Sequence, residues 1–330
     1  MIEHHDDIRQ AILRTVAFFD AMDYAPSVTE VGAWMELPQT SQQDPGRVAA
    51  LLRPLENGTL PSETGAAEQR PYPNATLAKD GLVAEGLIQE GRGRLALHGR
   101  LDDLLALSAE RTPLFPRKLR AARKVARWLA RNPAVRFVAL ANTTALAHAR
   151  DEGDLDFFVI VRHGAIWSTR LIGGTPYRLA GRLAGRPKEH EDAVCLSYFI
   201  SDERLDLSSH LLPGDDPYFR YWFLALLPLF DDGVSRELWQ ANHEIRAHHP
   251  FAERWMVSPG LEVTRPFVRI TGISLLEPLA RKFQMRWFPV SIRQRMNVDT
   301  SVLINDRVLK FHIDDGRAAY REAYRKRLPL

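Results

Sequence analysis

Two short apolar runs separated by a polar segment constrain the fold of this chain more than any other feature. Residues 135–140 (VRFVAL) and 156–161 (DFFVIV) have the length and the β-branched and aromatic content of buried strands. Side chains alternate between the two faces of a strand, so Asp154 and Asp156 share one face while Leu155 and Phe157 point into the core. We therefore expect an α/β centre, with a small mixed sheet that has helices on one side.

The two carboxylates predict a site for a hard cation. Neighbouring carboxylates repel each other, and each makes ionisation of the other less favourable. A cation between them removes that cost, and Mg²⁺ prefers oxygen ligands. Asp154 and Asp156 alone do not fill an octahedral shell, so water and triphosphate oxygens would complete it. Such a site suits phosphoryl or nucleotidyl transfer, although a D-x-D at the start of a strand also occurs without any metal.

The N-terminal part has the element order of a winged helix. An apolar stripe at helical spacing predicts a first helix, Ser27 or Thr29 is placed to cap a second, and residues 77–85 predict a third. A further short helical run is expected at Val48–Leu55. Residues 87–97 (LIQEGRGRLAL) predict a small hairpin that would be the wing. The stripe of the first helix consists of Ile8, Ile12, Leu13, Val16 and Phe19.

Charge separates the chain into two parts. Residues 1–110 hold 9 basic and 17 acidic residues, a balance of −8, whereas residues 111–330 hold 35 basic and 24 acidic residues, a balance of +11. The acidic balance opposes DNA binding by a winged helix, which needs positive charge near phosphates. A protein contact, including a homodimer formed through this part, is the preferred role. The basic remainder favours phosphates and polyanions as partners, or is simply a solvated surface.

The 330 residues are expected to form three parts: a winged-helix-like domain at 1–112, the α/β core at 113–250 and a mainly helical region at 251–330. The single cysteine, Cys195, excludes a disulfide framework. The polar N-terminus is unlike a secretory signal, and the most apolar stretch, residues 221–230, is half the length of a membrane span. We expect a cytoplasmic protein without a membrane partner.

The central block resembles the polymerase β-like nucleotidyltransferase superfamily. The pattern V-x-x-V-x-L at 135–140, a short polar turn, and then G-D-L-D-F-F-V-I-V at 153–161 carries the resemblance. It implies that the turn at Asn142 and Thr143 holds nucleotide phosphates and that Asp154 and Asp156 bind the catalytic metals. In this superfamily the turn is usually Gly-Ser. Asn is the non-glycine residue that best tolerates the left-handed backbone, and Thr143 keeps the hydroxyl.

More of the chain is similar to an uncharacterised bacterial and archaeal branch of that superfamily. The shared elements are Trp-x-x-Arg at 167–170, C-L-S-Y-F at 195–199 and L-K-F-H-x-x-D-x-R at 309–317. Arg170 is a candidate contact for the triphosphate, or an ordinary surface arginine. Lys310, His312 and Arg317 are expected to form a salt-bridge set with nearby acids, with a phosphate site as the alternative.

The expected third acid of the superfamily is absent from the strand at 193–200 (AVCLSYFI), where the polar residue is Ser197. Asp192 or Glu191, just before that strand, is a candidate substitute. We expect a Mg²⁺-dependent enzyme that transfers NMP from an NTP to a hydroxyl of a small molecule, a protein or an RNA end. The alternatives are a catalytically degenerate nucleotide sensor or scaffold, and a winged-helix DNA-binding regulator.

Overall fold

The contacts of the chain group into two compact units. The computed structural model describes residues 2–37, 73–185, 191–257 and 260–328, so the helical run expected at Val48–Leu55 lies outside the described residues. The N-terminal unit comprises residues 1–109, 244–253 and 319–330, and the sheet unit comprises residues 110–243 and 254–318. The expected three-part division follows the sequence order, whereas these units interleave along the chain. No helix in the described ranges has both the length and the apolar character needed to cross a bilayer.

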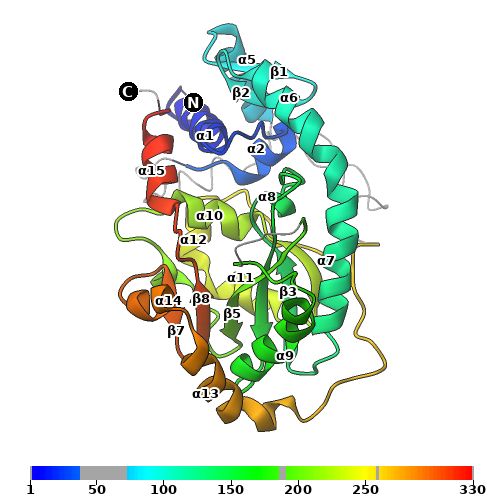
Figure 1. The fold of residues 1–330 in the computed structure, drawn as a ribbon. Coiled ribbons are helices and arrows are strands. Elements are labelled where there is room, and N and C mark those ends of the chain that lie inside the picture. The colour runs from blue at the N-terminus through cyan, green and yellow to red at the C-terminus, as the bar shows by residue number, and fades with distance from the viewer. Residues whose placement is uncertain (1, 38–72, 186–190, 258–259, 329–330) are drawn as a thin grey trace, which may run out of the picture. The chain divides into compact units, whose positions relative to one another are not determined.

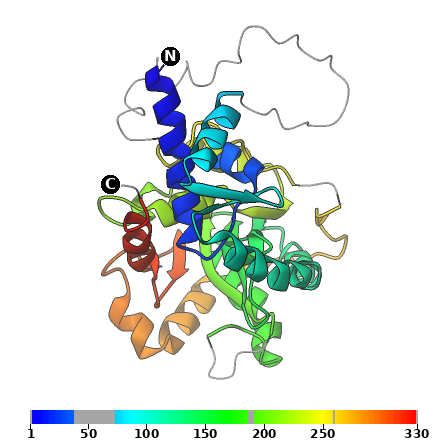
Figure 2. The same cartoon turned by 90° about the horizontal axis from the view of Figure 1, so that it is seen from above.

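The N-terminal unit packs helices around a two-stranded hairpin (Figure 2). Ser27 caps the second helix through a capping box with Glu30, which confirms one of the two expected caps. The hairpin is also confirmed, and Arg92 and Gly93 at its turn both have positive φ, as a tight two-residue turn requires. Its elements are α1 (Ile2–Asp20), α2 (Val28–Trp34), α5 (Pro73–Ala84), β1 (Ile88–Gly91), β2 (Arg94–Leu97) and most of α6 (Leu101–Arg111).

The first helix buries the stripe that the sequence predicts. Every member of that stripe is at most 5% exposed and belongs to the core of the N-terminal unit or to the aromatic contacts beside it. Helical spacing of apolar residues therefore placed this element correctly, because a stripe repeating every three or four residues lies on a single side of a helix.

The sheet unit contains a six-stranded mixed sheet in the order β6-β3-β4-β5-β8-β7. The pair β4 and β5 is parallel and the other pairs are antiparallel, so the α/β class and the mixed sheet are confirmed. The strands are β3 (Val135–Leu140), β4 (Leu155–Val161), β5 (Val194–Ser201), β6 (Leu227–Asp231), β7 (Val302–Ile304) and β8 (Val308–Phe311).

Helices cover both faces of this sheet, which corrects the expectation that they lie on one side (Figure 1). Residues of α7 (Phe115–Leu129), α9 (Ile166–Leu179) and α13 (Glu277–Trp287) share one core with Phe157 and Val159 of β4. On the opposite face Phe158 contacts Trp222 of α10 (Pro217–Leu224), and α11 (Ser235–Ala241) packs beyond it. The physical reason lies in the strand composition: β4 is apolar at nearly every position, so both of its faces need cover.

The C-terminal region supplies strands as well as helices. Besides α13 it contributes β7, β8, α14 (Val290–Arg295) and α15 (Arg317–Arg325). Strand β8 pairs with β5, so residues expected in a mainly helical region complete the sheet that carries the candidate site. The shorter helices of the described chain are α8 (Asn142–Ala145), α12 (His243–Ala247), η1 (Thr112–Leu114), η2 (Ser208–His210) and η3 (Ile273–Leu276).

Candidate functional site

The two carboxylates lie at the entry to the central strand β4. Asp154 precedes the strand and Asp156 is its second residue, and both side chains are partly buried. Leu155 and Phe157, between and after them, are 1% and 2% exposed, so the alternation expected from the sequence is present. Cys195 of β5 is the register partner of Asp156, and both carboxylates act electrostatically on its thiol. The structure thus gathers Asp154, Asp156 and Cys195 into one small cluster.

The turn after β3 joins this cluster through Asn142. Its φ of 56° is left-handed, a conformation in which asparagine is favoured over other non-glycine residues. Its Nδ2 donates to Asp156 Oδ2 at 2.8 Å, and its Oδ1 accepts from the Tyr218 hydroxyl at 3.2 Å. Thr143 follows in α8 and is partly buried, and the Thr144 hydroxyl donates to the carbonyl of Asp154 at 3.1 Å. The turn and the carboxylate pair therefore form one hydrogen-bonded group.

Burial controls the ionisation of this group. Desolvation raises the pKa of Asp156, while the hydrogen bonds from Asn142 and Cys195 act in the opposite direction. Burial, followed by the negative charge of Asp156, raises the pKa of the Cys195 thiol well above its ordinary value. The thiol is therefore protonated at neutral pH and serves as a hydrogen-bond donor beside the carboxylates.

A buried lysine holds the backbone in front of the carboxylates. Lys118 of α7 is 1% exposed, and its Nζ donates to the carbonyls of Asp151 and Gly153 at 3.0 and 2.7 Å. The same Nζ donates to Asp192 Oδ1 at 3.0 Å. Lys118 therefore ties the turn before β4 to the turn before β5, and it positions Asp154 without belonging to the carboxylate cluster itself.

The two candidates for a third acid differ in their surroundings. Asp192 is buried, has a φ of 56°, and is paired with Lys118 and with Arg117, whose Nε lies 3.3 Å away. Glu191 is exposed and lies 3.6 Å from Arg117. Asp192 thus acts as the counter-ion of a buried lysine in this conformation, and neither acid hydrogen-bonds to Asp154 or Asp156.

Arg170 is engaged in contacts between α9, β5 and α13. Its guanidinium donates to the carbonyl of Leu196 at 3.1 Å and to Gln284 Oε1 at 2.7 Å, and it lies over the ring of Phe311. Burial lowers its pKa to about 10, so it remains charged at neutral pH. These contacts account for Arg170 structurally, and its proposed contact with a triphosphate stays a prediction.

Arg317, at the end of the L-K-F-H-x-x-D-x-R segment, is the centre of a largely buried ionic network. Arg317 bonds to Asp315 and to Asp216, the latter at 2.8 Å and itself 1% exposed. Lys310 donates to the carbonyl of Thr300, and burial lowers its pKa to about 7. Burial also lowers the pKa of His312 to about 3, so this ring is neutral at neutral pH. Arg317 therefore forms salt bridges as expected, whereas Lys310 bonds to a carbonyl and His312 is neutral; a phosphate site formed by these residues stays a prediction.

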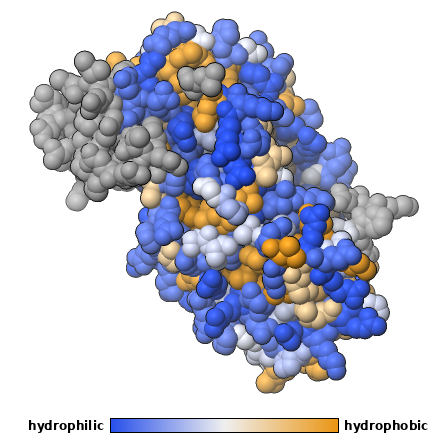
Figure 3. Space-filling view, turned by 90° about the vertical axis from the view of Figure 1, so that its left-hand side faces the viewer, coloured by the Kyte–Doolittle hydropathy of each residue, from blue (hydrophilic) through white to orange (hydrophobic). Residues whose placement is uncertain are grey.

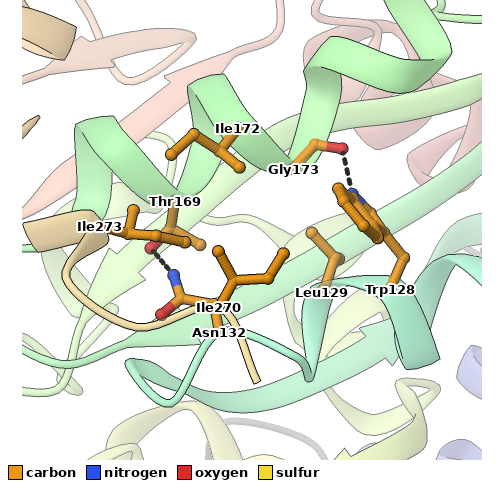
Figure 4. Close-up of a pocket in the computed structure, with 8 residues that line it drawn as sticks. All are labelled: Trp128, Leu129, Asn132, Thr169, Ile172, Gly173, Ile270 and Ile273. Carbon is orange, nitrogen blue, oxygen red and sulfur yellow. Dashed lines mark hydrogen bonds between the residues drawn. The ribbon is translucent and has the colours of Figure 1, made fainter. Parts of the chain in front are cut away.

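A small pocket lies on the opposite face of the sheet from Asp156, between α7, α9 and the segment before η3 (Figure 4). Its polar atoms are paired: Asn132 Nδ2 donates to Thr169 at 2.7 Å, and Trp128 Nε1 donates to the carbonyl of Gly173 at 3.0 Å. The rest of the lining is mostly apolar, so this pocket offers no charged group to a nucleotide. The lining residues are Trp128, Leu129, Asn132, Thr169, Ile172, Gly173, Ile270 and Ile273.

Among the described residues, no group of three or more histidine, cysteine, aspartate or glutamate side chains is arranged to hold a metal ion. The pair of carboxylates has the donor chemistry that Mg²⁺ prefers, but it supplies only part of a coordination shell. Any Mg²⁺ bound there would need oxygen atoms from outside the protein.

Sequence reasoning missed Lys118, Cys195 and Tyr218 as neighbours of the site. The sequence does contain an indication of Lys118. It lies on the same side of α7 as the buried residues Ala122, Val125 and Ala126, and a lysine buried there needs a polar partner. The other two depend on strand register and on the packing of α10, which the sequence alone does not define.

No family model matches the chain, and neither a curated protein nor a solved structure matches it significantly.

Proposed function

We propose that the protein is a Mg²⁺-dependent nucleotidyltransferase that moves an NMP from an NTP to a hydroxyl acceptor. The observation that carries the proposal is the hydrogen-bonded group of Asn142, Asp156 and Asp154, in which the turn after one strand meets paired carboxylates at the start of its neighbour. This is the arrangement that the resemblance to the polymerase β-like superfamily implies.

The residues have separate roles in the proposed reaction. Asp154 and Asp156 would hold Mg²⁺, and Thr143 with the adjoining turn would contact the phosphates. When bound, Mg²⁺ supplies positive charge to the triphosphate and to the pentavalent transition state. The acceptor oxygen forms a bond to the α-phosphorus as the bond to pyrophosphate breaks, and the acceptor proton passes to a base. We assign that role to Asp156 or to a third group; burial raises the pKa of Asp156, which favours its accepting a proton.

The test is calorimetric titration of ATP, GTP, CTP and UTP, each with and without Mg²⁺. The variants are Asp154→Asn and Asp156→Asn, with Glu152→Gln as the matched control, because Glu152 is an exposed acid in the same loop. We expect Mg²⁺-dependent binding of at least one nucleotide, lost in both site variants and kept in the control. Absence of binding at millimolar nucleotide, or equal binding by all variants, would refute the proposal.

A nucleotide-binding protein without turnover is the second candidate. Two groups expected to take part in catalysis already have other partners, which favours this candidate. The Asn142 amide, expected near the phosphates, bonds to Asp156, and Asp192, a candidate third acid, pairs with Lys118. Release of pyrophosphate from the bound NTP distinguishes the two, because a sensor binds the nucleotide and releases none. The DNA-binding alternative is further opposed by Lys79, the one basic residue of α5, which pairs with Asp80 and Glu90.

A further inference from the structure

Large exposed apolar side chains gather in a single stretch of the sheet unit. Between Phe267 and Val298 lie nine of the 14 large apolar residues found exposed in the described chain. Five of them recur every three or four residues, and we call them the exposed stripe: Leu279, Phe283 and Trp287 lie along one side of α13, Leu276 is its N-cap residue, and Val290 begins α14. The rings of Phe283 and Trp287 lie 5.8 Å apart, so the two form one apolar surface.

Other residues of α13 form the side of the helix that packs against the rest of the sheet unit. Ala280 and Gln284 are buried, and Gln284 hydrogen-bonds to the carbonyl of Trp167 in α9. The exposed stripe is therefore not the packing side of α13. In the lower part of Figure 3, at the height that α13 has in Figure 1, orange side chains lie at the surface among blue ones.

Positive charge accompanies the stripe. Residues 267–298 contain six basic residues and a single acid, Glu277. Glu277 is committed to α9, where its carboxylate accepts from the backbone N–H groups of Trp167 and Ser168 at 2.9 and 2.8 Å. Lys282, Arg286 and Arg293 are exposed and form no ion pair with any described residue. We call the five stripe residues together with these three cations the α13 surface.

We propose that the α13 surface binds the face of an anionic lipid bilayer. An amphipathic helix that lies in the membrane interface combines leucine and aromatic side chains, which enter the acyl boundary, with lysine and arginine, which meet anionic headgroups. Trp287 at the end of α13 has the amphipathic ring that favours the headgroup level. A protein bound in this way lies on the membrane surface and needs no helix that crosses the bilayer.

Charge and chemistry favour a bilayer over two other occupants. The α13 surface itself contains three cations and no acid, so a second copy that presented the same surface would bring like charges together. A nucleic acid would be attracted by the cations, but a stripe of leucine and valine gives nothing to phosphates or base edges. An anionic bilayer uses both the apolar and the basic residues.

The test is co-sedimentation of the full chain with vesicles of phosphatidylcholine alone and of phosphatidylcholine mixed with phosphatidylglycerol. We compare the wild type with Phe283→Ser/Trp287→Ser and with Lys282→Gln/Arg286→Gln. The matched control is Leu179→Ser/Met256→Ser, which removes two apolar side chains that are 83% and 74% exposed outside the α13 surface. All substituted positions are exposed, and circular dichroism checks that each variant is folded.

We expect the wild type and the control to bind the anionic vesicles, more weakly at high salt, and each α13 double variant to bind roughly tenfold more weakly. Trp287→Phe should keep binding while losing part of the blue shift in tryptophan fluorescence. Absence of binding to anionic vesicles, or equal binding by the α13 variants and the wild type, would overturn the proposal. So would a concentration-dependent dimer that Phe283→Ser/Trp287→Ser abolishes in a chain that binds no vesicles.

Discussion

At the scale of single residues, Asp156 is held in an environment that disfavours its ionised form. Within the described chain its hydrogen bonds come from neutral donors, Asn142 and Cys195, so burial outweighs them and its pKa is raised. A charge kept in such a place costs stability. Asp192 is the contrast, because a buried lysine neutralises it.

The raised pKa predicts a pH-dependent gain in stability for Asp156→Asn. The folded state holds the Asp156 proton more tightly than the unfolded chain, so the wild type loses stability as the pH rises from the ordinary value of 3.8 through the raised pKa. Asp156→Asn lacks this loss and should be more stable than the wild type at neutral pH, with the difference vanishing below about pH 4. Urea midpoints from pH 4 to 8, in EDTA, measure it. Parallel curves for the two proteins would contradict the assignment of a raised pKa.

The sequence predicted most of the residues that form the candidate site, but it did not predict the residues that they contact. The alternation of β4 placed Asp154 and Asp156 on one face, and the tolerance of asparagine for positive φ anticipated the conformation of Asn142. The pairing of Asp156 with Cys195 follows from the register of β4 against β5, which a shift near Phe158 also alters. Register between strands far apart in the sequence depends on packing, so no local pattern reports it.

At the scale of elements, α7 is connected to the starts of β4 and β5 by one side chain. Lys118 reaches two carbonyls of the turn before β4 and the carboxylate of Asp192 before β5. Because these bonds are buried, they fix the relative positions of both strand starts, where the carboxylate pair lies. The sequence predicted the strands β4 and β5, but the connection that Lys118 of α7 makes between them is tertiary.

Removing this connection should destabilise the sheet unit. Lys118→Met leaves the Asp192 carboxylate buried with only Arg117 as its cation, and we expect a loss of about 3 kcal/mol in the free energy of unfolding. Lys124→Met, which changes an exposed lysine on the same helix, should cost less than about 0.5 kcal/mol. Adding Asp192→Asn to Lys118→Met should recover part of the loss, since it removes the uncompensated charge. Urea denaturation tests all three variants. A Lys118→Met midpoint equal to that of Lys124→Met would show that the bonds of Lys118 do not stabilise the sheet unit.

At the scale of the whole molecule, the N-terminal unit is completed by residues from the far end of the sequence. Phe251 belongs to its hydrophobic core, and Tyr324 of α15 donates to Glu36 Oε2 at 3.0 Å. The difference in charge between residues 1–110 and 111–330 suggests contiguous domains, whereas contacts between distant segments leave no local signal in the sequence. Helices α1, α2 and α5 and the hairpin of this unit were predicted from local patterns, but α6 and the C-terminal members of the unit were not.

Tyr324 gives this organisation a direct test. Its ring is 1% exposed and contacts Phe18 of α1 edge to face, and its hydroxyl bonds to the buried carboxylate of Glu36. Tyr324→Ala removes the ring and a partner of that carboxylate, so we expect the N-terminal unit to lose about 3–5 kcal/mol of stability. Hydrogen exchange followed by mass spectrometry should show faster exchange in α1 and α2, with β3, β4 and β5 unchanged. Lys326→Ala, an exposed position on the same terminal segment, should leave all of these elements as protected as in the wild type. Unchanged protection of α1 in Tyr324→Ala would mean that residues 319–330 do not support the N-terminal unit.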